Sequence, residues 1–262
     1  MSMNNIKLPV LNIDYEYWKN KNSFYSTDKL LPGDSISVGL KQAAKGNLLD
    51  IASIKTPHDL ISKIEKRIKI VNLHNCSDTD FLIIFDLIQG WGGKQNRHSY
   101  NARLGKPPLR ISDPSKFALS YKEVIETLFE TKHVTRYDKK FIQSIVKGVE
   151  SVDSLRLPFG SKHLFFWSWK SNFAKIYYIY DTRMKNLMKS IFLKTGVSYY
   201  EFLIFLEETT DKFNLRSPLI AERAIFGFSN HFFPNGSLCI NNHQKNSKDF
   251  EEALKLSERG KK

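Results

Sequence analysis

Cysteine is almost absent from this chain of 262 residues, which holds only Cys76 and Cys239. Two cysteines make no disulfide framework, and such scarcity is typical of proteins kept in a reducing compartment. His74 lies close to Cys76 and His243 lies close to Cys239, but neither spacing matches a zinc finger. We therefore expect no metal site and no cofactor.

Long hydrophobic runs are also missing. No apolar stretch approaches the ~20 residues that a membrane-spanning helix requires, and the opening MSMNNIKLPVLNIDYEYW lacks the apolar core of a signal peptide. These absences predict a cytoplasmic protein with no membrane partner. Strand patterns are equally scarce, because the β-branched and aromatic run KIYYIY is short and isolated.

Charge is strongly unbalanced, with 40 Lys and Arg against 27 Asp and Glu and a formal net charge of +13. This excess favours a polyanionic partner, nucleic acid before an anionic membrane, although an ordinary basic soluble protein is also compatible with it. Aromatic residues make up 13% of the chain. They suit stacking on bases, but we expect most of them in the core.

Helix signals recur from Thr56 onward and predict a mainly α fold. Proline follows a capping residue at Thr56-Pro57, Asp113-Pro114 and Ser217-Pro218, which is the usual start of a helix. Further helices are expected from Ser77 or Asp78 to Gly90, over 137–150, over 197–213 and over 247–262. Residues 1–55 show weak periodicity, so we expect an N-terminal extension packed on one helical domain, residues 56–262.

A hairpin of two helices is predicted near residues 150–170. Leu157-Pro158-Phe159-Gly160 has the composition of a tight turn in which Gly160 takes a positive φ. Ser161 would then cap the second helix, whose free N–H groups suit a phosphate. Lys162 would lie in the first turn, where the helix macrodipole disfavours a positive charge. This unfavourable position suggests that the lysine is there for a functional reason. A solvated or phosphate-contacting lysine is the alternative.

Asp181 stands nineteen positions after Lys162, at the end of a second aromatic run. It precedes a helix whose apolar face holds Met184, Leu187, Met188 and Ile191. Asp181 is then the natural N-cap, and capping alone explains an aspartate there. However, a lysine and an aspartate at two helix starts, each flanked by aromatics in a basic chain, together suggest a shared function.

These residues resemble the helix-hairpin-helix DNA glycosylases, in particular the 8-oxoguanine DNA glycosylase branch and the bacterial OGG-fold proteins. That family has a Leu-Pro-Gly-x-Gly hairpin continuing as Gly-Thr-Lys, with a catalytic lysine and, nineteen residues later, a catalytic aspartate. Gly160-Ser161-Lys162 and Tyr180-Asp181-Thr182 hold the matching positions, and IQGWGG is similar as well. This hairpin is one residue shorter, with Phe159 in place of a glycine. The four-cysteine cluster of some members is absent, so no iron–sulfur centre is expected.

The resemblance implies an enzyme that flips a base out of double-stranded DNA and excises it. The Lys162 amine would attack the sugar C1′, which requires a neutral, desolvated amine beside an apolar wall. Asp181 would stabilise the developing positive charge or activate water. A Schiff base at Lys162 would add AP lyase activity. The residues expected to form the apolar wall are Phe165, Phe166 and Trp167.

The implied substrate base is oxidised guanine, or else a modified base of phage DNA, which would give a role in antiviral defence. We expect the protein to act as a monomer. A non-catalytic DNA-binding protein on the same fold, or an RNA-binding protein, are the alternatives.

The Gly-rich basic segment Gln89–Lys106 is expected to face DNA as a loop, although an ordinary surface loop anchored by its tryptophan is the alternative. No nucleotide-binding fingerprint surrounds its glycines. The residues expected to fill the gap left by a flipped base are Gln89, Trp91 or Asn96. Those expected to bind DNA phosphates are Lys94, Arg97, Arg103, Gly160, Ser161 and Arg183. For Arg183 a solvated helix face is the alternative.

Overall fold

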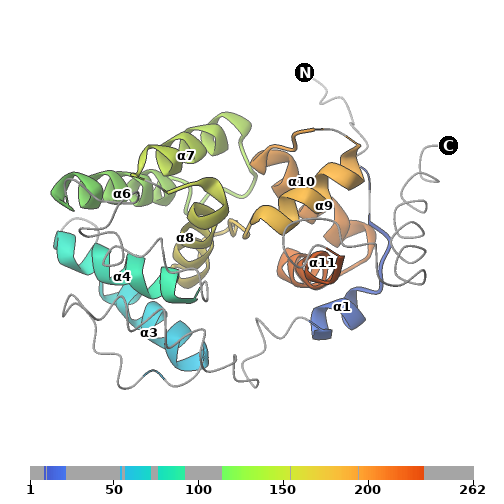
Figure 1. Ribbon diagram of the computed structural model, residues 1–262, viewed down its shortest axis with the longest axis horizontal. Helices are drawn as coiled ribbons and strands as arrows, with labels where there is room; N and C mark the ends of the chain where they lie inside the picture. Colours follow the sequence, from blue (N-terminus) through green and yellow to red (C-terminus); the bar gives the residue numbers. More distant parts are fainter. Residues whose placement is uncertain are drawn as a thin grey trace. The chain divides into compact units, whose positions relative to one another are not determined.

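The computed structural model describes residues 9, 11–21, 54, 57–71, 76–91, 114–153, 155–193 and 195–232. Over these ranges all regular structure is helical, in nine helices with no strand (Figure 1). The mainly α class predicted from the sequence is thereby confirmed. The aromatic run KIYYIY, residues 175–180, belongs to no regular element. The helix expected over 247–262 lies outside the described residues.

The chain divides after Ile179 into two compact units. One, which we name the hairpin unit, is Ser26–Ile179; the other, the split unit, combines Met1–Tyr25 with Tyr180–Lys262. The division expected from the sequence, an extension over 1–55 and a helical domain over 56–262, stays a prediction. Lys162 belongs to the hairpin unit, whereas Asp181 belongs to the split unit.

The hairpin unit is built around its last helix. Its helices are α3 (Pro57–Ile70), α4 (Asp78–Trp91), α6 (Pro114–Phe129), α7 (Lys139–Ser151) and α8 (Leu157–Lys170). The predicted starts at Pro57 and Pro114 are confirmed, and α4 continues one residue past the expected stop at Gly90. Helix α8 contacts each of the other four helices and is the central helix of the unit (Figure 1).

Helix α8 is central because it lacks a polar face. Every residue from Gly160 to Ser168 is buried except Lys162, which is half-buried. A helix that is apolar all round has to be covered on all sides. The largest completely buried side chains of the unit are Phe81, Phe85, Phe117, Tyr121, Phe165, Phe166 and Trp167.

The predicted turn at Leu157–Gly160 is wrong. Helix α8 already begins at Leu157, with Arg156 as its N-cap and Pro158 in its first turn. Proline is tolerated there because the first N–H groups of a helix have no intrahelical partner. The connection to α7 lies upstream, where the Leu155 N–H donates to the Val152 carbonyl at 2.9 Å. Lys162 is therefore in the second turn of α8, and Ser161 is a helical residue rather than an N-cap.

Gly160 serves close helix packing instead of a turn. It is buried, and a Cβ atom added to it would lie 2.0 Å from Cγ1 of Val149 on α7. Real Cβ atoms never approach a carbon so closely. Gly160 thus allows α7 and α8 to pack against each other directly beside Lys162.

The split unit is arranged around α11 (Pro218–Phe232), which contacts α1 (Tyr15–Lys21), α9 (Thr182–Phe192) and α10 (Tyr199–Lys212). Three of its helix starts agree with the capping patterns of the sequence. Asp181 accepts the Met184 N–H at 2.9 Å, Ser198 and Glu201 form a capping box, and α11 begins at Pro218. Trp18 of α1 packs edge-on against Phe228 with ring centroids 5.2 Å apart.

Replacing Gly160 by alanine should destabilise the α7–α8 pair. The steric conflict with Val149 should lower the free energy of unfolding by about 1–3 kcal/mol. Alanine has a higher helix propensity than glycine, but this raises the free energy of unfolding by only ~1 kcal/mol. Hydrogen exchange of the α7 and α8 amides should therefore accelerate. Gly196→Ala is the control, because a Cβ there meets nothing within 4 Å. Protection that stays unchanged in Gly160→Ala would contradict the close contact.

A carboxylate of α3 ties that helix to α8. Glu65 accepts hydrogen bonds from Lys69 at 2.7 Å and from Lys170 of α8 at 2.9 Å. These bonds, that from Lys69 first, lower the pKa of Glu65 to about 2 from its ordinary 4.5. Because the folded pKa is the lower one, the stabilisation is present above pH 4.5 and is lost as the pH falls toward 2.

In Glu65→Gln the free energy of unfolding should therefore decrease less steeply between pH 4.5 and pH 2 than in wild type. The Glu65 side chain is 35% exposed, so the effect at neutral pH should stay below about 1 kcal/mol. Urea midpoints measured between pH 7 and pH 2 check this, with Glu150→Gln, an exposed position on α7, as the control. Parallel curves for wild type and Glu65→Gln would show that the two bonds contribute nothing.

Candidate functional site

Lys162 is the residue that distinguishes helix α8 from an ordinary core helix. It is half-buried, and its Nζ lies 5.1 Å from the centroid of the Phe159 ring. On both sides of it along the helix the neighbouring residues are buried. The amine therefore stands at the edge of an aromatic core, partly withdrawn from water.

His163, the residue after Lys162, belongs to a buried hydrogen-bond network that the sequence did not reveal. We call this network the relay; its members are Gln89, Tyr121, His163 and Trp167. His163 is 1% exposed. Its Nε2 lies 2.9 Å from Nε2 of Gln89 on α4, and its Nδ1 lies 2.8 Å from the Tyr121 hydroxyl on α6. The Trp167 indole N–H donates to the same hydroxyl at 2.9 Å. Three helices are thus joined by hydrogen bonds inside the core.

The partners determine how His163 is protonated. The Gln89 side-chain nitrogen can only donate, so Nε2 accepts, and the Nδ1–H of a neutral ring donates to the Tyr121 oxygen. The Phe85 ring stacks on the imidazole with centroids 4.6 Å apart. Burial raises the pKa of Tyr121 far above its ordinary value. The Tyr121 hydroxyl therefore keeps its proton across the physiological pH range.

The expected loop residues Gln89 and Trp91 belong to the last turn of α4. Both are buried, Gln89 against His163 and Trp91 against the Phe166 ring at a centroid distance of 5.2 Å. The prediction that the loop begins at Gln89 is wrong, and we assign both side chains to the core. The other expected loop contacts, Lys94, Asn96, Arg97 and Arg103, lie outside the described residues.

The start of α8 offers few free donors to a phosphate. Pro158 has no N–H, and the N–H groups of Phe159 and Gly160 both donate to the Arg156 carbonyl, at 2.9 and 2.8 Å. The Ser161 hydroxyl is buried and lies 3.4 Å from the Pro158 carbonyl. Gly160 and Ser161 are both buried here, and the phosphate contacts expected of them stay a prediction.

Asp181 occupies the N-cap position of α9, as the sequence predicted. It is half-buried, and its carboxylate accepts the Met184 N–H at 2.9 Å. Arg183, the expected phosphate contact, is half-buried in the first turn of α9. Both residues belong to the split unit. Within that unit, the structure gives Asp181 a helix-capping role.

Two acidic residues, Asp86 and Glu222, are completely buried, and the sequence analysis did not single them out. Asp86 interrupts the apolar run FLIIFDLIQG of α4, and Glu222 interrupts the apolar face of α11; neither has any exposed surface. Carboxylates are almost never fully buried unless they are paired. An acid inside an apolar helical run is the pattern that marks such positions.

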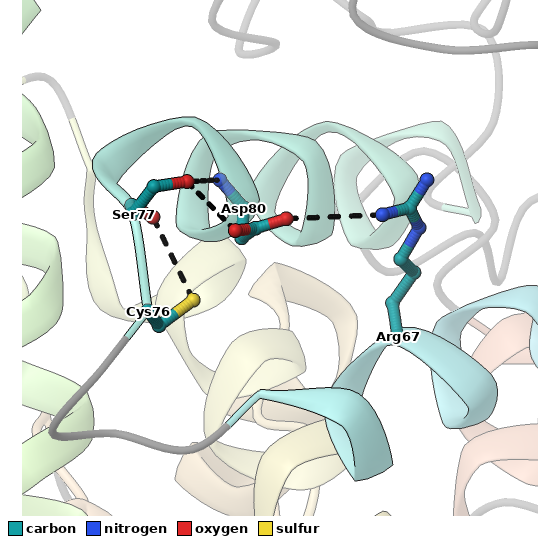
Figure 2. Close-up of polar contacts among 4 residues, drawn as sticks. All are labelled: Arg67, Cys76, Ser77 and Asp80. Carbon is teal, nitrogen blue, oxygen red and sulfur yellow. Dashed lines mark hydrogen bonds and ion pairs between the residues drawn. The ribbon is translucent and has the colours of Figure 1, made fainter.

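The Cys76 thiol, two residues before α4, is a weak nucleophile at neutral pH. Figure 2 shows the Cys76 thiol directed to the Ser77 carbonyl at 3.6 Å, and Asp80 held by the Ser77 hydroxyl at 2.7 Å and by Arg67 at 3.8 Å. Burial, and next the Asp80 charge, raise the pKa of Cys76 to about 11. The thiol is therefore protonated at neutral pH. His74, Cys239 and His243 lie outside the described residues.

Two further features are absent from the described ranges. No group of three or more His, Cys, Asp or Glu side chains there is arranged to hold a metal ion. None of the helices described has both the length and the hydrophobicity needed to cross a bilayer.

Comparison of the chain with protein-family models, with curated proteins and with solved structures finds no match in any of the three.

Tyr121→Phe should destabilise the hairpin unit through the relay. It removes the oxygen that receives the Trp167 and His163 N–H groups, and each buried donor left without an acceptor costs about 1–3 kcal/mol. Urea unfolding followed by hydrogen exchange in α6 and α8 measures this loss. Tyr17→Phe is the control, since Tyr17 is 48% exposed. Equal stability of the two variants would show that the relay contributes no net stability.

Proposed function

We propose that the protein is a DNA glycosylase that uses Lys162 to excise a damaged or modified base. The observation that carries this proposal is the position of Lys162, the single half-buried residue in the otherwise buried stretch Gly160–Ser168 of α8. A lysine partly withdrawn from water is more easily kept neutral than a solvated one. A neutral amine is what a nucleophile requires.

The helices around Lys162 support the same proposal. Helices α7 and α8 are joined by the short connection Val152–Arg156 and pack closely through Gly160. The second turn of α8, next to this close contact, carries Lys162. The net charge of +13 favours a polyanionic partner. The Gly-Ser-Lys motif of the resemblance to helix-hairpin-helix glycosylases lies on the second helix of this pair, although the connection is at Val152–Arg156 and not at Leu157–Gly160.

The proposed reaction begins with the lone pair of Nζ forming a bond to the sugar C1′. The glycosidic bond breaks, and its electron pair leaves with the base, which takes up a proton. Loss of the second amine proton and ring opening give a Schiff base, from which β-elimination cleaves the strand. The role of Asp181, stabilisation of the positive charge on the sugar, rests on its separation from Lys162 in the sequence.

A second candidate is a DNA-binding protein without catalysis. The contact of Lys162 with the Phe159 ring favours it, because the face of an aromatic ring attracts an ammonium group. A cationic Lys162 would serve as a phosphate contact and would not attack C1′.

Borohydride trapping separates the two candidates. Purified protein is incubated with duplexes that contain oxidised guanine, uracil or glucosylated hydroxymethylcytosine. Wild type should release one base and form a covalent adduct, and Lys162→Ala should lose both by a factor of at least about 10², as expected for removal of a nucleophile. Lys66→Ala, an exposed lysine on α3, is the matched control and should keep both.

The remaining outcomes are equally informative. Base release that persists without an adduct in Lys162→Ala would contradict the nucleophilic role and direct attention to Asp181 and water. Binding of every duplex with no release would support the non-catalytic candidate.

A further inference from the structure

Two connections of the hairpin unit lie side by side and gather cations from separate parts of the sequence. The Ala174 N–H donates to the Lys132 carbonyl at 2.9 Å, and the Tyr137 hydroxyl donates to the Ile176 carbonyl. The α6–α7 connection is thereby fastened to the stretch that follows α8. We name the resulting surface the Tyr137 patch; its cations are Lys132, Arg136, Lys139, Lys140 and Lys175.

The cations of the Tyr137 patch outnumber its acids. Arg136, Lys139 and Lys140 are exposed, and none of these three forms an ion pair with a carboxylate in the described part of the chain. The acids in the connection are Glu130 and Asp138, and the Asp138 carboxylate already accepts the Phe141 N–H at 2.8 Å. The surface is therefore positively charged.

Two of these lysines stand where they weaken the helix that carries them. Lys139 and Lys140 are the first residues of α7, a helix of 13 residues whose first turn contains no acid. A cation at this end opposes the macrodipole at a cost of about 0.3–1 kcal/mol each. An anionic ligand would remove that cost and would be attracted by both lysines, whereas the helix end itself is already capped by the Asp138 carboxylate.

The aromatic rings of the patch hold the remaining cations in place. The Nζ of Lys175 lies 5.7 Å from the centroid of the Tyr137 ring, and that of Lys132 lies 5.8 Å from the Phe129 centroid. Tyr137 itself packs edge-on against Tyr177 at 5.8 Å. Side chains fixed in this way lose less entropy on binding than freely moving lysines do.

We infer that the Tyr137 patch binds the phosphate backbone of duplex DNA, an inference that takes its partner from the proposed function. Five cations spread over two connections and the start of α7 fit a row of phosphates better than one small anion. Helix α7 extends for about 20 Å from the patch to the turn before α8, which is the length of about six base pairs. One duplex along α7 would thus contact the patch while its bases are near the helix that carries Lys162.

The test compares the salt dependence of duplex binding between two triple variants. In the first, Arg136→Gln, Lys139→Gln and Lys140→Gln remove the exposed patch cations. Each phosphate contact contributes about 0.9 to the slope of log K against log salt. The slope should therefore become shallower by about 2–3, and affinity should fall about 10- to 100-fold at ~0.1 M salt.

The control removes the same charge elsewhere. Lys66→Gln, Lys116→Gln and Arg216→Gln replace two lysines and one arginine that are exposed outside the patch. If both triple variants change the slope equally, net charge alone acts and the inference is overturned. Wild-type protein that binds single-stranded RNA but no duplex, or no nucleic acid at all, overturns it as well.

The two experiments distinguish an error in the proposed function from an error in this inference. A patch-dependent slope together with absence of base release keeps the patch and removes the glycosylase. Base release with a slope that the patch variant leaves unchanged keeps the glycosylase and removes the patch.

Discussion

The imidazole of His163 lies where water does not reach it, so other side chains have to satisfy both of its nitrogens. Gln89 and Tyr121 do so from α4 and α6, at distances of 2.9 and 2.8 Å. Both bonds require the His163 side chain to face α4 and α6. Neighbouring residues on a helix point about 100° apart. With His163 directed inward, Lys162 is held at the rim of the core.

Local rules predicted where most helices begin, because a cap and a proline act within a few residues. Pro57, Pro114, Asp181 and Pro218 all mark helix starts as expected. The same rules failed at Leu157–Gly160, since proline and glycine are compatible with a turn and also with a first helical turn packed against a neighbour. Which of the two forms depends on Val149, and that contact is tertiary. The partners of His163 are equally remote in the sequence, so an aromatic run with one histidine did not identify them.

The basic residues of the hairpin unit have two environments, and the difference matters for recognition. Arg136, Lys139 and Lys140 are exposed, as suits contacts to phosphates that position a duplex without reading its sequence. Lys162 is instead set into an aromatic helix, where a withdrawn amine can act on one atom of a substrate. In the proposed function the first group supplies affinity and the second supplies chemistry.

The division of the chain also has a consequence for how the protein is made. Helix α1 contacts α11, and Trp18 packs on Phe228, although the entire hairpin unit is translated between them. A ribosome therefore delivers every residue of the hairpin unit before the partner of Trp18 exists. During that interval the apolar face of α1 has no native surface to cover it, while the hairpin unit can already fold. Biosynthesis thus imposes an order of assembly, with closure of the split unit as its last event.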